Sequence, residues 1–540
     1  MNVAEAVGRA VASAGVTTAF GVVGSGNFHV TNALVRHGAR FVAARHEGGA
    51  ITMADGYARM SGQTGVVTVH QGPGLTNAMT GLAEAAKSRT PLVVLAGEVT
   101  SPRSNFYVDQ AALASAVGAV PFRVQSARTA LADVAEALHT AWHDRRAVVL
   151  NLPLDVQAQP VDDAEMSLEP APSSKAADTE DLARFAEILN AAERPVFVAG
   201  RGARDARPEL EALAGRTGAL LATSAVARGL FNGSPWNLDV SGGFATPLAA
   251  ELIRAADLVV GWGCALNMWT MRHGALIGPS ATVVQVDLEA AALGAHRPID
   301  LGVTGDVAAT AAALLPQVPE RTGYRSPEVA TRISGEGRWR DVPYEDEGGE
   351  TVIDARTLTI ALDDLLPAER IVSIDSGNFM GYPSMFLSVP DEYGFCFTQA
   401  YQSIGLGLAT AIGAALARPD RLPVAALGDG GALMGVAELE TVVRLGLPMV
   451  VVVYDDEAYG AEVHHFGPDG HPLDTVVFPP ADIAAIARGF GFEALTVRDP
   501  DDLAPVADWV KGPRDRPLLI DAKVTRDHGS WWLEEAFRGH

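Results

Sequence analysis

The fold is decided by two short stretches, LGDGG (427–431) and YDDEAYG (454–460), which lie one helix and one strand apart. The apolar runs 423–427 and 448–453 before these stretches are typical of buried strands, and 436–445 has a helical pattern. A strand-helix-strand unit of this length predicts a right-handed parallel crossover, so both strands end at the same edge of one sheet. Open α/β sheets bind their ligands at that edge.

Acidic residues and glycines come together at this predicted edge. Asp429 lies in the first turn, and the pair Asp455-Asp456 lies in the second. Two carboxylates beside a glycine-rich turn suit a hard divalent cation, and the free N–H groups of such a turn bind phosphate oxygens. The sequence therefore predicts a site for a magnesium diphosphate. A bare glycine turn beside a solvated acidic loop is the alternative, and the position of the second acidic pair argues against it.

The arrangement resembles the signature of thiamine-diphosphate enzymes, in which GDG is followed by a pair that is usually Asn-Asn. The resemblance implies that Asp429, Asp456 and the carbonyl of Ala458 bind Mg²⁺. It also implies further contacts to the cofactor, from Gly428, Gly430, Gly431, Tyr459 and Gly460. The chain departs from the family pattern by carrying Asp at both positions of the pair. This keeps an oxygen ligand and adds negative charge, which leaves the metal affinity open.

Motifs near the N-terminus extend the resemblance. A predicted strand at 18–23 and a GSG turn at 24–26 precede the segment FVAARHEGGA (41–50), which continues into ADGYAR (54–59). The family pattern is a short strand, then His-Glu, then a helix of small residues that carries ADGYAR. By this resemblance Glu47 protonates the pyrimidine N1′ of the cofactor, whose own nitrogen then removes the thiazolium C2 proton. A glutamate that is merely favoured by the dipole at a helix N-terminus is the plainer interpretation.

A second loop of the family follows in the same region. The strand pattern at 65–70 leads into QGPGLTN (71–77), which matches the family's GPG-x-TN loop. That loop meets the cofactor from the pyrimidine side, so the resemblance makes Gly74 and Asn77 cofactor contacts.

Two further groups of cofactor contacts are expected in the C-terminal part. Ile404 matches the bulky apolar residue that holds thiamine in its bent shape, and the carbonyl of Gln402 is expected to accept from the aminopyrimidine. Ordinary core packing is the alternative for Ile404. Gly377 and Asn378 follow the predicted strand 370–374 and are expected to contact the diphosphate.

The length of 540 residues exceeds one hydrophobic core and suits three domains. We expect an α/β chain of three doubly wound parallel-sheet domains: pyrimidine-binding (1–165), central and Rossmann-like (180–320), and diphosphate-binding (351–540). The first and third look like duplicated folds. Polar segments at 157–178 and 322–350 are interpreted as the linkers.

Composition limits the class of protein. Hydrophobic residues make up 48% and charged residues 20% of the chain, and no segment reads as a membrane span or an export signal. The cysteines, Cys264 and Cys396, are interpreted as reduced core residues, so a cytoplasmic location is expected. A formal net charge of −24 argues against nucleic acid and anionic membranes as partners.

The resemblance also implies a small-molecule 2-oxo acid substrate. Family members decarboxylate it and pass the resulting enamine to a proton, an aldehyde, another keto acid or an oxidant. His70 occupies the place of an active-site histidine in benzoylformate-decarboxylase-like members, and Ser25 lies near their carboxylate-binding serine. Glu462 and His465, after the metal loop, are expected to act as general acid and base. A histidine bonded only to backbone, and residues that only hold the loop, are the alternatives.

Several positions separate the chain from acetolactate synthase. Leu154 stands where that enzyme carries Lys, HHF (464–466) replaces its Trp-bearing motif, and no flavin-binding sequence is recognisable in 262–272. We therefore expect a flavin-free decarboxylase or carboligase, a lyase or transferase without FAD. An acetolactate-synthase-type carboligase or flavin-dependent oxidase, and a non-catalytic cofactor-binding relative, remain as alternatives. Family members share their sites between subunits, so a homodimer or homotetramer is expected.

Overall fold

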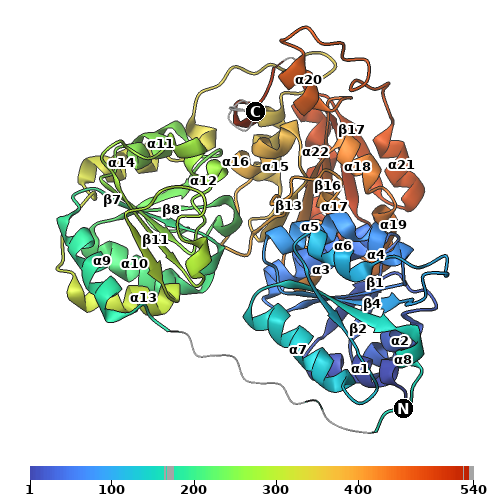
Figure 1. Cartoon of the computed structure of the whole chain (residues 1–540). Helices are drawn as coiled ribbons and strands as arrows, with labels where there is room; N and C mark the ends of the chain where they lie inside the picture. Colours follow the sequence, from blue (N-terminus) through green and yellow to red (C-terminus); the bar gives the residue numbers. More distant parts are fainter. Residues whose placement is uncertain (163–165, 167–174, 527, 534–540) are drawn as a thin grey trace.

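The computed structural model describes residues 1–162, 166, 175–526 and 528–533. Its strands form three six-stranded sheets in which every pairing between strands is parallel, with helices around each sheet (Figure 1). The prediction of three doubly wound α/β domains is therefore confirmed. Residues 163–165, 527 and 534–540, which the predicted domain ranges include, lie outside the described residues.

The first sheet has the strand order β2-β1-β3-β4-β6-β5. Its central strands are short apolar runs that are buried along their whole length, because helices cover both faces. The strands are β1 (Thr18–Gly21), β2 (Arg40–Ala43), β3 (Gly65–Val69), β4 (Leu92–Glu98), β5 (Val120–Arg123) and β6 (Ala147–Pro153). The helices are α1 (Val3–Ser13), α2 (Phe28–Arg36), α3 (Glu47–Ser61), α4 (Pro73–Asn77), α5 (Met79–Lys87), α6 (Gln110–Ala116), α7 (Ala130–His143) and α8 (Leu154–Gln157).

The central sheet has the order β12-β11-β10-β7-β8-β9, which is the dinucleotide-binding order with its switch point between β7 and β10. Its strands are β7 (Pro195–Ala199), β8 (Leu220–Thr223), β9 (Asn237–Val240), β10 (Leu258–Trp262), β11 (Thr282–Asp287) and β12 (Leu301–Thr304). Its helices are α9 (Thr179–Ala191), α10 (Arg207–Thr217), α11 (Pro247–Arg254), α12 (Met268–Met271) and α13 (Val307–Leu314).

The third sheet has the order β14-β13-β15-β16-β18-β17, which repeats the order of the first sheet strand for strand. The expected duplication is therefore visible in the topology. The strands are β13 (Arg370–Ile374), β14 (Phe395–Phe397), β15 (Leu422–Gly428), β16 (Val450–Asp455), β17 (Glu493–Val497) and β18 (Leu518–Lys523). The helices are α15 (Ala355–Leu365), α16 (Gly381–Phe386), α17 (Gly407–Ala417), α18 (Asp429–Met434), α19 (Glu438–Leu445), α20 (Gly460–Phe466), α21 (Ile483–Phe490) and α22 (Ala504–Lys511).

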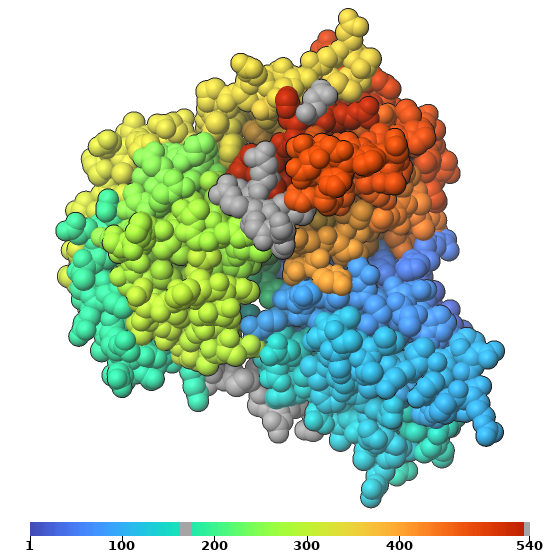
Figure 2. All heavy atoms as spheres, turned by 45° about the horizontal axis from the view of Figure 1, so that its top comes forward, coloured from blue at the N-terminus to red at the C-terminus, as the bar shows by residue number. Residues whose placement is uncertain are grey.

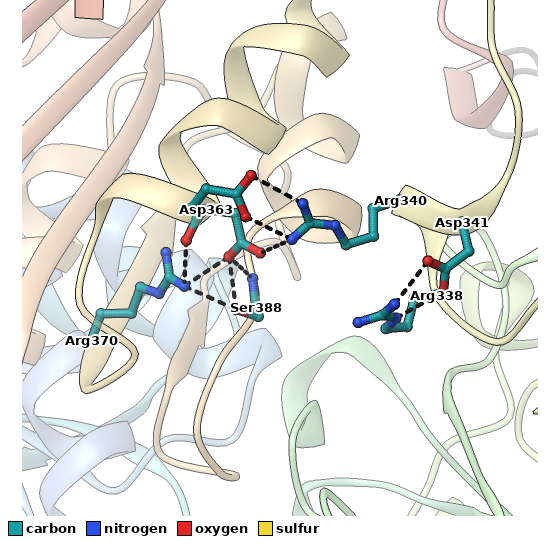
Figure 3. Close-up of polar contacts among 7 residues, drawn as sticks. Arg338, Arg340, Asp341, Asp363, Arg370 and Ser388 are labelled. Carbon is teal, nitrogen blue, oxygen red and sulfur yellow. Dashed lines mark hydrogen bonds and ion pairs between the residues drawn. The ribbon is translucent and has the colours of Figure 1, made fainter. Parts of the chain in front are cut away.

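The segment 322–350, interpreted as a linker, has structure of its own. It contains helix α14 (Pro327–Glu336) and a short 3₁₀ helix at 339–341. Arg340 in this turn pairs with Asp363 and Asp364 on α15, and Asp363 also binds Arg370 and Ser388 (Figure 3). These ion pairs fasten the segment to the third domain.

The first and third domains pack against each other through α3 and α17. Figure 2 shows the blue surface of the first domain adjoining the orange surface of the third. A Cβ added at Gly56 would lie 2.6 Å from the carbonyl oxygen of Thr410, and one at Gly413 would lie 2.0 Å from that of Met53. Glycine is therefore required for this close approach. Because residue numbers rise along α3 as they fall along α17, the two helices run antiparallel.

Both cysteines are buried and free, as expected. Within the described part of the chain, no helix is long and apolar enough to cross a membrane.

Candidate active site

A cavity of about 470 Å³ lies at the carboxyl edge of the third sheet, where the turns after β13, β15 and β16 meet. Nearly all the site residues predicted in the C-terminal part line it: Gly377, Asn378, Gln402, Ile404, Gly428, Asp429, Gly430, Gly431, Asp456, Ala458, Tyr459, Gly460 and Glu462. His465 does not line the cavity, and its ring packs edge-on against Phe466 with 4.6 Å between centroids.

The electrostatics of the cavity favour a bound cation. Asp429 begins α18 directly after β15, and Asp456 directly follows β16, which is the neighbouring strand. Burial raises the pKa of Asp429 to about 8, and the charges of Asp456 and Asp455 add to the shift. Burial also raises the pKa of Asp456 to about 7. A divalent cation between the carboxylates would remove this penalty, because an opposite charge favours the ionised form.

The two aspartates of the pair have different surroundings. Asp455 is the last residue of β16 and lies beside Lys523 in β18, whose ammonium group forms an ion pair with it. Lys523 Nζ also lies 3.2 Å from Asp521 Oδ1 and donates to the carbonyl of Ala481. Successive strand residues face opposite sides of a sheet. The charge that Asp455 adds to the family's usual pair is therefore compensated by Lys523, away from the cavity.

Glycines in the cavity wall allow the backbone to approach the carboxylates of Asp456 and Asp375 closely. A Cβ at Gly460 would lie 2.2 Å from Asp456 Oδ2, and one at Gly431 would lie 2.2 Å from Asp375 Oδ2. Among the described residues, no group of three or more His, Cys, Asp or Glu side chains could hold a metal. The expected ligand set contains only two carboxylates and a main-chain carbonyl, so this result does not test it and the set stays a prediction.

The predicted residues of the first domain form a second group. Glu47 is the first residue of α3, and Asn77 Nδ2 donates to Glu47 Oε2 at 3.0 Å. His70 follows β3, and a Cβ at Gly74 would lie 3.2 Å from the Cβ of His70. Ser25 is exposed in the turn that packs against His70.

The hydrogen bonds of His70 define its protonation. The N–H of Gly26 donates to His70 Nδ1 at 3.2 Å, and the ring packs edge-on against Phe106. Burial lowers the pKa of His70 below its usual 6.5, although the carboxylate of Glu47 opposes the shift. An imidazole that accepts at Nδ1 is neutral and carries its proton on Nε2. His70 therefore presents a donor at Nε2 near Glu47.

The two groups do not meet within one chain. None of the described residues that line the cavity comes from the first domain. Gly56 contacts Thr410 near the start of α17, the end of that helix next to the cavity. Glu47 lies about nine residues back along the antiparallel α3, which is about 14 Å further from the cavity at 1.5 Å per residue.

Family models match the three domains. The N-terminal TPP binding domain of thiamine pyrophosphate enzymes matches residues 1–120, the central domain 182–314 and the C-terminal TPP binding domain 375–522. The chain belongs to the thiamine pyrophosphate enzyme family. The resemblance stated from the sequence is thus confirmed, and the two TPP binding domains indicate thiamine diphosphate as the cofactor.

Curated relatives of this thiamine pyrophosphate enzyme cover nearly its whole length. A probable 2-ketoarginine decarboxylase of Pseudomonas aeruginosa is 30% identical over 93% of this chain and 90% of its own. Acetolactate synthase isozyme 2 large subunit of Escherichia coli is 28% identical over 99% and 97%. Pyruvate oxidase of Lactiplantibacillus plantarum is 27% identical over 95% and 87%. These relatives are enzymes with different reactions, so the family membership leaves the reaction of this chain open.

Sequence reasoning missed several residues of the cavity wall in this thiamine pyrophosphate enzyme, among them three large side chains. Met268 and Trp269 reach it from α12 of the central domain, and Trp532 reaches it from the C-terminal segment. Trp532 is 2% exposed, and a Cβ at Gly381 would lie 2.4 Å from its ring. No motif surrounds these positions, so only the packing of the domains reveals them.

Proposed function

We propose that the chain catalyses the thiamine-diphosphate- and Mg²⁺-dependent decarboxylation of a 2-oxo acid, with the acyl unit passed to a proton or a carbonyl acceptor. The observation that carries the proposal is the pair of Asp429, which is buried, and Asp456, which is half-buried; the pair shares one cavity with the glycine turns, Gln402 and Ile404. A relative named as a 2-ketoarginine decarboxylase, similar over most of both chains, supports decarboxylation as the reaction class.

Each part of the cavity suits one part of the cofactor. Asp429, Asp456 and the carbonyl of Ala458 would hold Mg²⁺, and the N–H groups of the glycine turns would bind the diphosphate. The side chain of Ile404 would pack against the cofactor and support its bent shape, and the carbonyl of Gln402 would accept from its amino group. When bound, thiamine diphosphate supplies the nucleophile and the electron sink for decarboxylation.

The first domain would supply the proton-transfer groups. Glu47 would hold a proton at the pyrimidine N1′, and Asn77 fixes the orientation of its carboxylate. The neutral ring of His70 would donate from Nε2, and Ser25 would bind the substrate carboxylate. Glu462 faces the cavity from α20 and would serve as a further acid. His465 does not line the cavity, so its position does not support the predicted role as a general acid or base, which stays a prediction.

We infer that each site is shared between two subunits. The separation of Glu47 from the cavity along α3 supports this inference, because one cofactor must contact both Glu47 and Asp429. A closed two-fold dimer would form two equivalent sites, each with the first domain of one chain and the third domain of the other.

A second candidate function is that of a flavin-dependent oxidase or carboligase. A cavity of about 390 Å³ lies at the carboxyl ends of β7, β8, β10 and β11, the switch point of the central sheet. Cationic side chains line it: Arg59, Lys87, Arg89, Arg145 and Arg201. Burial, with the nearby charges of Arg59 and Arg204, lowers the pKa of Arg201 to about 9, so an anionic nucleotide would be favoured there. Absence of FAD therefore stays a prediction, and a yellow purified protein would decide for the flavin enzyme.

The test is incubation with thiamine diphosphate, Mg²⁺ and a panel of 2-oxo acids that includes 2-ketoarginine, with carbon dioxide and acyloins both measured. Glu47→Gln is the matched control, because the amide keeps the bond from Asn77 and cannot share a proton with N1′. We expect its turnover to fall by orders of magnitude. Turnover within a few-fold of wild type would contradict the assignment, and cofactor binding without any turnover would favour a non-catalytic relative.

A further inference from the structure

We propose that Glu84 on α5 of the first domain is a positioning residue for the cofactor loop of its own chain, residues 398–404. This inference rests on the proposed function, because the loop carries Gln402 and Ile404, the residues proposed to accept from the aminopyrimidine and to support the cofactor.

The cofactor loop has a backbone conformation that needs support. It forms no helix or strand between β14 and α17, and Gln402 has a left-handed φ of +59°. A residue other than glycine rarely adopts this conformation, which persists where the surroundings hold it. This residue, Gln402, is also the one whose carbonyl is proposed to accept from the cofactor.

Glu84 holds the loop on the side before Gln402. Its side chain is buried, at 1% exposed, and its Oε1 and Oε2 accept from the N–H groups of Ala400 at 3.1 Å and Tyr401 at 2.6 Å. Burial alone would raise the pKa of Glu84, but Arg59 and these two N–H donors keep it below the usual value. Glu84 is therefore an ionised acceptor, and hydrogen bonds to charged groups are the stronger ones.

Arg59 completes this attachment and connects it to helix α3. Its guanidinium binds Asp55 and Glu84, and its Nη1 donates to the carbonyl of Phe397 at 2.8 Å. The side chains of Arg59 and Glu84 are buried, and together they join the first domain to the third at Phe397 and at residues 400–401. The same helix begins with Glu47. In the proposed dimer, α3 would therefore contribute Glu47 to the site on the partner subunit's third domain, and its Arg59 would hold the cofactor loop of its own chain.

Asp375 holds the loop on the side after Gln402. It directly follows β13, is 1% exposed, and its Oδ2 accepts from the N–H of Gly405 at 2.9 Å. The left-handed residue thus lies between two buried carboxylates, one from each domain. Loss of Glu84 would release one of these two attachments while the fold of the third domain persists.

The test compares substitutions of Glu84 with a matched control. Glu84→Asp keeps the negative charge beside Arg59 but withdraws the carboxylate from the loop, and Glu84→Gln places an amide N–H₂ against the loop N–H groups. Thr90→Val is the control, because Thr90 is also buried after α5 and its hydroxyl has no hydrogen-bond partner among the described residues.

We expect the Kd for thiamine diphosphate, at saturating Mg²⁺, to rise about 10- to 100-fold in both Glu84 variants, which corresponds to one or two lost bonds to a charged group. The circular dichroism of the bound cofactor should change with it, and Thr90→Val should match wild type. Gln402→Gly should restore part of the affinity of Glu84→Asp, because glycine adopts a positive φ without strain. Wild-type affinity and an unchanged cofactor spectrum in Glu84→Asp and Glu84→Gln would overturn the inference.

Amide hydrogen exchange of the unmodified protein supplies a measurement that needs no variant. Tyr401 is 47% exposed, yet its N–H and that of Ala400 should exchange slowly, because Glu84 binds both. Exchange of both amides at the rate of an unstructured chain would also overturn the inference. If the wild-type protein bound no thiamine diphosphate, the proposed function would fail, and the exchange rates would still decide the attachment of the loop.

Discussion

Complementation between two inactive variants tests the proposed shared site most directly. Glu47→Gln removes the acid of the first domain, and Asp429→Ala removes a carboxylate of the third. From the Gly56–Thr410 contact, Glu47 lies about 14 Å back along α3, and Gly407 lies about 4 Å back toward the start of α17. Because the helices are antiparallel, these two displacements point in opposite directions, so about 18 Å of helix separates Glu47 from Gly407. An acid must lie within hydrogen-bond distance of the group it protonates. We therefore expect a single chain to lack a complete site.

The magnitude follows from two-fold symmetry. Equal mixing with free exchange makes about half of the dimers hybrids, and each hybrid has one site with both lesions and one with neither, so about a quarter of all sites should work. The assay is decarboxylation after subunit exchange, with hybrid formation followed by native mass spectrometry. A mixture of Asp429→Ala and Asp456→Ala is the control, because both lesions lie in the same half-site and no hybrid site is intact.

Two results would refute this reasoning. One is the absence of recovered activity in samples where hybrids are shown to form. The other is a fully active monomer by light scattering, because a monomer would have to bring Glu47 to its own cavity.

Further substitutions test the other features of the site. Asp456→Asn should retain the cofactor in equilibrium dialysis, since Asn keeps an oxygen ligand, and loss of binding would show that both charges are needed. Lys523→Met should lower the free energy of unfolding, measured by urea titration, by about 3–5 kcal/mol, because it leaves Asp455 and Asp521 buried without a cation. Asp455→Asn in the same chain should recover much of this loss. An equal loss in the single and the double variant would refute the pairing of Lys523 with Asp455. The lowered pKa of His70 means that the unfolded chain takes up the proton first as pH falls through 6.5. Stability should therefore decline below that pH. The value of kcat/KM follows the folded protein, so it should decline at the lower pKa of folded His70, and His70→Ala should lose this acidic limb of the rate profile if His70 acts as proposed. The absorbance spectrum of the purified protein should show no flavin bands, and a flavin spectrum would replace the proposed function by the second candidate.

Much of the site was predictable because its chemistry is local in the sequence. The glycine turns after β15 and β16 carry Asp429 and Asp456 within a few residues of their strands, and parallel strands bring such turns to one edge. The family resemblance named Glu47 and His70 as candidates in the first domain, and the structure shows that the charge of Glu47 acts on His70. Glu462 and His465 show the limit, since both lie on the short helix α20 and only Glu462 lines the cavity.

The sequence by itself determined the fold class, because strand patterns and turn residues act over a few neighbouring positions. Its motifs also indicated thiamine diphosphate as the cofactor, through the family resemblance. Only the tertiary structure decided how Asp455 is neutralised, since Lys523 lies 68 residues further along the chain. It alone showed Glu84 bound to Tyr401, 317 residues away. These contacts depend on how strands pair and how two domains pack, and no local pattern records that. The separation of Glu47 from Asp429 likewise follows from the antiparallel packing of α3 on α17.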